Sequence, residues 1–325
     1  MNQLDRKKWM QLHQIAKDLF ERHDPMIERL GIISVILPAQ NEPHYVLFLE
    51  DNLLVFPGEG ALSLLFMLSE KEQMPSVQRL RYQHHLAAYR GSQDDVSVEG
   101  LALLNELNLP VSGEVIFFES SIPNLLPDIL SISEVKTMTD VLKQCVKLLD
   151  EVKDSDILST MNEDMTLVRS FDFDSGTWIN SVKMLEVADQ RVVKPKVKEE
   201  FLEKLRQAPA NEDVLEVDVA YTPIMAEGKE GHRQAVVRIL LIANQTTRSI
   251  PYQKLITLKD EPMDHFVSAI VNHTLEAGTA KKWLVRDEIM AEIVSMVAAH
   301  AQVEVEISQQ LPIIDQYVEE LIKNI

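Results

Sequence analysis

The sequence predicts an α+β fold in two domains, and three observations lead to that prediction. A length of 325 residues corresponds to about two domains of roughly 150 residues each. With 46% apolar and 26% charged residues, the chain has enough apolar material for globular cores. Runs with a helical period alternate with short β-type runs along the chain. We place the boundary in the charged segment 189–198, which gives an N-terminal α+β domain over residues 1–190 and a C-terminal domain over residues 191–325.

The N-terminal domain is predicted to begin with a helix, because apolar residues recur every three or four positions before the Asp24-Pro25 pair. Three short strands follow, and a tight turn at Asp51-Asn52 separates the second from the third. The strands are predicted over 32–37, 45–49, 53–56, 114–118, 166–173 and 178–185, and the later helices over 61–68, 71–95, 98–107 and 139–152.

The C-terminal domain has the most regular pattern, which reads β-β-β-α-β-α-β-α. Three strands joined by short turns should be antiparallel, and two later strands reached through helices should run parallel to a neighbour. These rules predict a five-stranded mixed sheet with helices on its faces. After a short helix over 199–207, the strands are predicted over 214–221, 234–243, 249–258, 282–285 and 303–307, and the helices from Asp260 to Gly278, from Asp287 and from Pro312.

Four short segments in the two halves carry a resemblance: Phe56 to Leu62, Phe117 to Asn124, Trp283 to Glu288, and the Leu311-Pro312 pair that opens the last helix. They resemble segments of a group of uncharacterised bacterial proteins that pair two domains of unknown function. This resemblance implies the two-domain arrangement and no known activity. The element order of the C-terminal domain also resembles that of the ribonuclease H-like fold.

The ribonuclease H-like order leads to one catalytic hypothesis. Enzymes of that fold hold two divalent metal ions with carboxylates on the first strand, near the end of the fourth strand, and on or near a helix. Asp218, Asp287 and Asp315 occupy those places. With Mg²⁺ or Mn²⁺ they would form the site of a metal-dependent phosphodiester hydrolase. Further carboxylates close to these positions are Glu261, Glu276 and Glu288.

Each of the three carboxylates also has a structural explanation. Asp218 shares a strand face with Glu216 and can pair with Arg238 across the hairpin. Asp287 lies where a helix N-cap is expected, and Asp315 lies in the first turn of the last helix. Because the chain is rich in acids, three suitably placed carboxylates are weak evidence of catalysis.

The net charge of −19 bears on the partner. Residues 1–195 contribute −12 and residues 196–325 contribute −7, so neither half has the basic surface that nucleic-acid binding needs. We therefore favour a binding or interaction protein without catalysis or cofactor, whose partner is a basic protein or peptide. The metal-dependent hydrolase of phosphodiesters is the alternative.

Other features fit a soluble cytoplasmic protein. No apolar run is long enough to span a bilayer, and the N-terminus lacks the apolar core of a signal peptide. The single cysteine, Cys145, excludes an internal disulfide framework and is interpreted as a core residue.

Two weaker patterns have simple interpretations, and one suggests a repeat. His84-His85 is interpreted as part of the solvated face of a helix, and the acids around Gly176 as a hairpin turn. The order acid, helix, strand and proline recurs in segments 94–123 and 287–312, which raises the hypothesis that the two halves arose by duplication.

Overall fold

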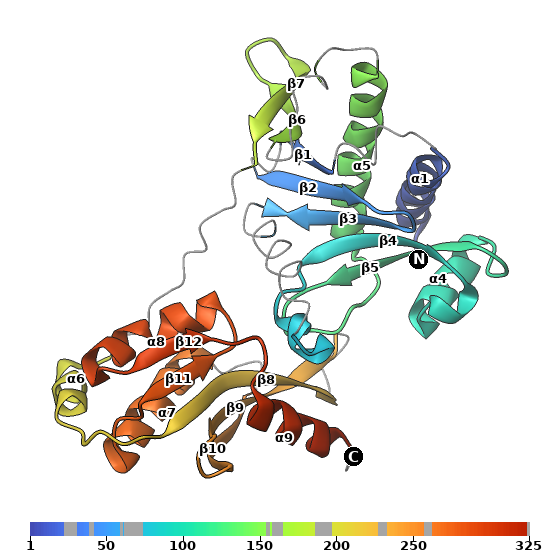
Figure 1. The fold of residues 1–325 in the computed structure, drawn as a ribbon. Helices are drawn as coiled ribbons and strands as arrows, with labels where there is room; N and C mark the ends of the chain where they lie inside the picture. The colour runs from blue at the N-terminus through green and yellow to red at the C-terminus, as the bar shows by residue number, and fades with distance from the viewer. Residues whose placement is uncertain are drawn as a thin grey trace. The chain divides into compact units, whose positions relative to one another are not determined.

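The computed structural model confirms an α+β protein with two compact units (Figure 1). The first unit comprises residues 1–66, 83–122 and 127–189, and the second comprises residues 67–82, 123–126 and 190–325. The second unit therefore includes two short segments from the N-terminal half of the chain. The structure describes residues 1–22, 31–38, 42–58, 61, 74–153, 157, 165–185, 197–226, 233–256 and 262–323.

The first unit is built on a seven-stranded sheet with the strand order β5-β4-β3-β2-β1-β6-β7. Every neighbouring pair is antiparallel except β1 and β6, which run parallel. The strands are β1 (Ile32–Ile36), β2 (Pro43–Phe48), β3 (Asn52–Pro57), β4 (His85–Gly91), β5 (Val115–Ser121), β6 (Met165–Asp172) and β7 (Thr177–Met184).

Helices α1 (Gln3–Phe20) and α5 (Ile132–Val152) supply much of the apolar core of this sheet, and α4 (Val98–Leu107) packs beside them. The helix α5 begins at a capping box in which Ser131 and Glu134 bond each other's backbone N–H groups. Cys145 is fully buried in this core, and burial raises the pKa of its thiol to about 12. The cysteine is thus a core residue, as predicted.

One predicted helix of the first half is wrong. Within residues 71–95 the structure has two short 3₁₀ helices, η1 (Ser76–Arg81) and η2 (Gln93–Asp95), with strand β4 between them. Strand β4 pairs with β3 on one side and β5 on the other. Because the sequence of this segment has no clear periodicity, the pairing determines its conformation. His85 consequently begins a strand and packs against the ring of Phe56 instead of facing solvent on a helix.

Several predictions fall outside the described residues. They are the helix end at Asp24-Pro25, nearly all of the helix over 61–68, the start of the helix at Asp260, and most of the boundary segment 189–198.

The second unit contains the predicted five-stranded mixed sheet, with the strand order β10-β9-β8-β11-β12. The first three strands are antiparallel, and β11 and β12 run parallel to β8 and to each other. The element order predicted from the sequence is therefore confirmed. The strands are β8 (Val214–Ala226), β9 (Ala235–Asn244), β10 (Ser249–Ile256), β11 (Lys282–Val285) and β12 (Glu304–Ile307).

Helices cover both faces of this sheet. The helices α6 (Glu199–Arg206), α7 (Pro262–Ala277) and α8 (Glu288–Ala301) share one apolar core with it, and α9 (Pro312–Lys323) packs in a separate cluster on the opposite face. Gly278 ends α7 with a φ of +93°, and a Cβ there would lie 2.5 Å from the carbonyl oxygen of Pro209. No helix in the described part of the chain is long and apolar enough to cross a membrane.

The two sheets do not share the topology that a duplication predicts. In the proposed repeat, β5 would correspond to β12. However, β5 runs antiparallel to its neighbour β4, whereas β12 runs parallel to its neighbour β11. The common order of elements in the sequence therefore leads to different pairings.

Candidate functional site

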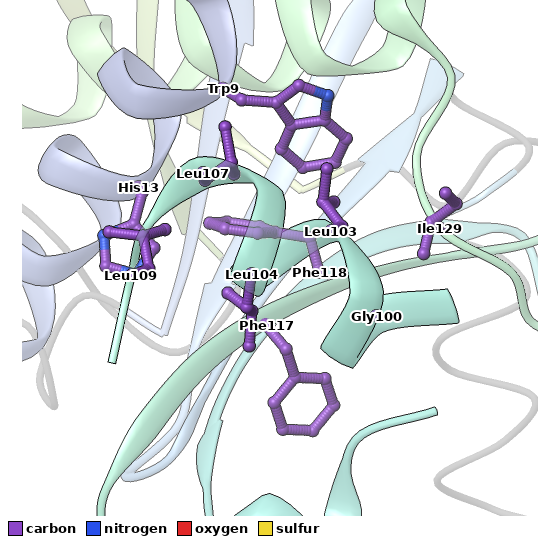
Figure 2. Close-up of a pocket in the computed structure, with 10 residues that line it drawn as sticks. All are labelled: Trp9, His13, Gly100, Leu103, Leu104, Leu107, Leu109, Phe117, Phe118 and Ile129. Carbon is purple, nitrogen blue, oxygen red and sulfur yellow. The ribbon is translucent and has the colours of Figure 1, made fainter. Parts of the chain in front are cut away.

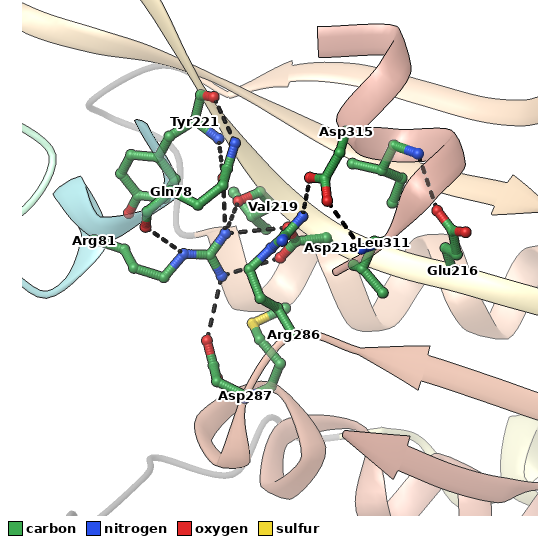
Figure 3. Close-up of polar contacts among 12 residues, drawn as sticks. Gln78, Arg81, Glu216, Asp218, Val219, Tyr221, Arg286, Asp287, Leu311 and Asp315 are labelled. Atoms are coloured by element: carbon green, nitrogen blue, oxygen red, sulfur yellow. Dashed lines mark hydrogen bonds and ion pairs between the residues drawn. The ribbon is translucent and has the colours of Figure 1, made fainter. Parts of the chain in front are cut away.

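The candidate site lies along β8, beyond the point where β11 stops pairing with it. Strand β11 pairs only with residues 214–216 of β8. Further along, Gln78 of η1 takes the place of a strand neighbour. Its amide nitrogen donates to the carbonyl oxygen of Tyr221 at 2.8 Å, and its amide oxygen accepts from the Tyr221 N–H at 2.8 Å (Figure 3). These bonds fix η1 against the sheet and direct the next side chains of the segment into the site.

Asp218 lies at the centre of the site and is fully buried. Arg81 binds it in a bidentate manner, with Nη1 donating to Oδ1 at 3.0 Å and Nη2 donating to Oδ2 at 3.1 Å. Arg286, which directly follows β11, donates from Nε to Oδ2 at 2.7 Å. One carboxylate therefore joins two guanidinium groups that come from opposite halves of the sequence.

The other two predicted carboxylates each bind one of the same arginines. Asp287 accepts from Arg81 Nη1 at 3.3 Å and from the hydroxyl of Tyr82. Asp315 accepts from Arg286 Nη2 at 2.7 Å. We call Arg81, Asp218, Arg286, Asp287 and Asp315 the arginine–carboxylate cluster. The sequence-predicted site residues thus converge, but around arginines (Figure 3).

Mutual attraction in a buried environment sets the electrostatics of this cluster. Burial alone raises the pKa of Asp218, but the charges of Arg81 and Arg286 outweigh it and lower this pKa below its ordinary value. Burial and the charge of Asp287 raise the pKa of the Tyr82 hydroxyl, so this tyrosine stays protonated and can donate. The guanidinium of Arg81 also lies 5.1 Å from the ring centre of Tyr221.

Two of the structural explanations of the three carboxylates are confirmed, and one is wrong. Asp287 is the N-cap of α8 and accepts from the Met290 N–H at 2.8 Å, as predicted. Asp315 lies in the first turn of α9, also as predicted. The proposed pairing of Asp218 with Arg238 is wrong, because Arg238 lies opposite Tyr221 in the sheet and donates to the side chain of Asn124.

The additional acids named with these carboxylates do not join the cluster. Glu276 and Glu288 are exposed on their helices. Glu261 lies outside the described residues. The hypothetical metal site is therefore limited to the three aspartates.

These residues do not fit a divalent metal centre as they are arranged. Each of the six carboxylate oxygens already accepts a hydrogen bond, since Asp315 Oδ2 accepts from the Leu311 N–H at 2.9 Å and the other five have the donors given above. A metal ion at the centre would meet two guanidinium charges. Within the described ranges, no three His, Cys, Asp or Glu side chains form a group that could hold a metal ion.

Glu216 performs a second structural role beside the cluster. It is fully buried and accepts from the N–H groups of Ile313 at 3.0 Å and Ile314 at 2.9 Å. Its other oxygen accepts from the side chain of Gln245 at 2.6 Å. This carboxylate therefore binds the positive end of the α9 dipole and attaches the helix to the sheet.

Neither arginine belongs to the site that the sequence predicts. The alternation of strand side chains gave a signal for Arg286. It follows β11 and lies on the same face of the sheet as half-exposed Leu284, opposite to the face of buried Trp283 and Val285. A charged residue on that face, next to an acid, indicates a buried pair. Arg81 had no such signal, because it lies 137 residues before Asp218 in a segment without periodicity.

The first unit has a separate feature, a small apolar pocket (Figure 2). Its walls include Trp9, Leu103, Leu107 and Phe118. His13 is its one ionisable side chain, and burial followed by the charge of Lys17 lowers the pKa of that imidazole. The pocket offers packing surface and few polar groups.

The fold and the cluster define the class as an α+β protein of two domains whose predicted site carboxylates are bound by arginines. Two family models match it. Residues 9–169 match the family described as Domain of unknown function (DUF7309), and residues 201–322 match Domain of unknown function (DUF6930). The chain therefore pairs two domains of unknown function, as its resemblances predicted. No curated protein matches it.

Proposed function

We propose that this chain is an interaction protein without catalysis, and that the arginine–carboxylate cluster is an internal clamp. The single observation that supports this function is that all six oxygens of Asp218, Asp287 and Asp315 are bonded to donors of the protein itself. A catalytic carboxylate needs a coordination position that a metal or substrate can take. Here those positions serve to hold η1, β8, α8 and α9 together.

Energetic considerations support the clamp. Removing one partner of a buried ion pair costs about 3–5 kcal/mol, because the remaining charge stays buried without compensation. A metal ion would have to displace Arg81 from Asp218 and Asp287 and leave that guanidinium without either acceptor. The cost of the exchange favours the arginine-bound state.

The acidic composition supports a basic partner. With a charge of −19, the chain attracts basic proteins or peptides and repels nucleic acid. We propose the bacterial cytoplasm as its location, on the resemblance to uncharacterised bacterial proteins and on the single cysteine, which forms no internal disulfide.

One observation favours the alternative of a metal-dependent phosphodiester hydrolase. The three carboxylates that the element order selects do lie around a common centre, joined through Arg81 and Arg286. A conformation in which Arg81 is withdrawn would leave Asp218 and Asp287 facing each other as ligands for Mg²⁺ or Mn²⁺.

Thermal unfolding of the full chain during titration with Mg²⁺ or Mn²⁺ separates the two functions. The clamp predicts no rise of the unfolding midpoint, whereas a bound metal raises it as its concentration increases. The matched variants are Asp218→Asn in the cluster and Glu276→Gln on the exposed face of α7. A metal-dependent rise that Asp218→Asn removes and Glu276→Gln keeps, together with hydrolysis of a model phosphodiester, would refute the proposed function.

A further inference from the structure

Three of the four edge strands in the two sheets have features that prevent pairing with another chain. Strand β5 is bridged by Asp128, which exchanges backbone hydrogen bonds with Ser120. Strand β10 contains Pro251 within an irregular stretch of its register. Strand β12 is only four residues long and carries two exposed glutamates. Short strands, charges, prolines and irregularities are the usual protections of an edge.

Strand β7 has fewer of these protections, since Lys183 is its one charged residue. It is eight residues long, contains no proline, and pairs with β6 in an unbroken register from Met184 to Thr177. No described strand pairs with its outer side. Ile179 is 45% exposed and Met184 is 67% exposed, so large apolar side chains lie along this edge. A long, regular and apolar edge is a surface on which another strand can add.

The hairpin tip next to β7 combines aromatic rings with acids. Phe171 packs edge-on against Trp178 and against Phe173, whose side chain is 68% exposed. Asp172 and Asp174 lie in the same turn. Exposed rings beside carboxylates attract lysine and arginine through both cation–π and charge interactions.

We propose that the outer edge of β7 binds an extended segment of a basic partner protein as an additional strand. The inference rests on the proposed interaction function and specifies its surface and partner. The backbone of β7 supplies hydrogen bonds, Ile179 and Met184 offer apolar contacts on opposite faces of the sheet, and the hairpin tip contacts basic residues of the segment.

Charge favours this occupant over a second copy of the chain. Two copies joined at β7 would bring together two molecules that each carry −19. Strand β7 itself carries no acid, and its one charged residue is Lys183. The acids instead lie at the hairpin tip, where basic side chains of an added strand can reach them.

Fluorescence anisotropy with the full chain and defined peptides tests the proposal. The probe is a labelled ten-residue peptide of alternating lysine and valine, and its controls are the glutamate–valine peptide and a lysine–valine peptide N-methylated at alternate residues. The variant Ile179→Lys places a charge on the β7 edge. The matched control Leu255→Lys adds the same charge on the protected edge of β10, where Leu255 is 59% exposed.

We expect saturable binding of the lysine–valine peptide that Ile179→Lys weakens about 10-fold or more, with Leu255→Lys within about 2-fold of the unchanged chain. N-methylation should weaken binding to a similar extent, because it removes backbone donors. Unchanged thermal midpoints would show that both variants are folded.

Three results would overturn the proposal. Equal losses in the two variants would mean that general charge attraction binds the peptide. A dimer in light scattering that Ile179→Lys dissociates would assign the edge to a second copy. A lack of saturable binding would remove β7 as the docking edge, while the proposed function would still be judged separately by the metal titration.

Discussion

At the scale of single residues, Asp218 joins three elements, because it lies on β8 and its two oxygens bind arginines from η1 and from the end of β11. Replacing it with asparagine should lower the free energy of unfolding by about 3–5 kcal/mol, since two buried guanidinium groups lose a common counter-charge. Urea unfolding measures this loss. The exposed Glu276→Gln variant should stay within about 0.5 kcal/mol of the unchanged chain.

The effect of Asp218→Asn on the free energy of unfolding should depend on pH, and the lowered pKa of Asp218 sets the direction of this dependence. A carboxylate with a lowered folded-state pKa stabilises the fold above the unfolded-state pKa of about 3.9 and loses this effect as the pH falls through the folded-state value. The stability difference between the unchanged chain and Asp218→Asn should therefore be largest at neutral pH and smaller at pH 3. A difference of the same size at both pH values would contradict the ion-pair explanation.

His85 gives an opposite case, in which the neutral form is favoured. Burial, followed by the nearby His84, lowers its pKa to about 4. The unfolded chain takes up a proton below pH 6.5 while folded His85 does not, so His85 destabilises the fold as the pH falls from 6.5 towards 4. We expect His85→Phe to reduce the loss of stability between pH 7 and pH 5, measured by urea unfolding, and to leave the comparison between pH 7 and pH 8 unchanged.

At the scale of elements, α9 depends on one buried side chain. Glu216 accepts from two N–H groups in the first turn of α9, where a carboxylate also complements the helix dipole. Glu216→Ala should cost about 1.5–3 kcal/mol, because hydrogen bonds to a charged group are lost and the donors remain buried. Hydrogen exchange should accelerate in α9 before it does in α8. Glu319→Ala, on the exposed side of α9, is the control and should leave exchange unchanged.

The elements also show what can be predicted from a sequence. Every strand and helix of the C-terminal sheet was predicted, because Leu215, Val217 and Val219 alternate cleanly and Gly278 and Asp287 mark helix ends. Strand β4 was missed because its neighbours β3 and β5 determine its conformation. The carboxylates of the site were found by topology, but Arg81 was not, since its contacts join segments far apart in the chain and no local pattern encodes them.

At the scale of the whole molecule, the C-terminal unit is not continuous in sequence. Residues 67–82 and 123–126 belong to it, although the matched family segment covers only residues 201–322. Gln78 and Arg81 bind β8, and Leu125 forms a bridge with Ala235 at the start of β9. The sheet of the C-terminal unit therefore depends on residues that precede the segment matched by the family model.

A fragment of residues 197–325 tests this dependence. Without Arg81 and Tyr82, Asp218 and Asp287 lose buried donors, so we expect the fragment to unfold at a lower urea concentration than the corresponding transition of the full chain. A synthetic peptide of residues 74–83 added to the fragment should raise its thermal midpoint, because it binds only the folded form. The same peptide with Arg81→Ala should raise the midpoint much less, since it keeps the amide contacts of Gln78 but lacks the guanidinium.

Equal effects of the two peptides would show that docking depends on Gln78 and apolar contacts alone. A fragment as stable as the full chain would show that segment 74–82 is dispensable. The expected difference between the peptides would establish that an arginine encoded in the N-terminal half completes the charge balance of the C-terminal sheet.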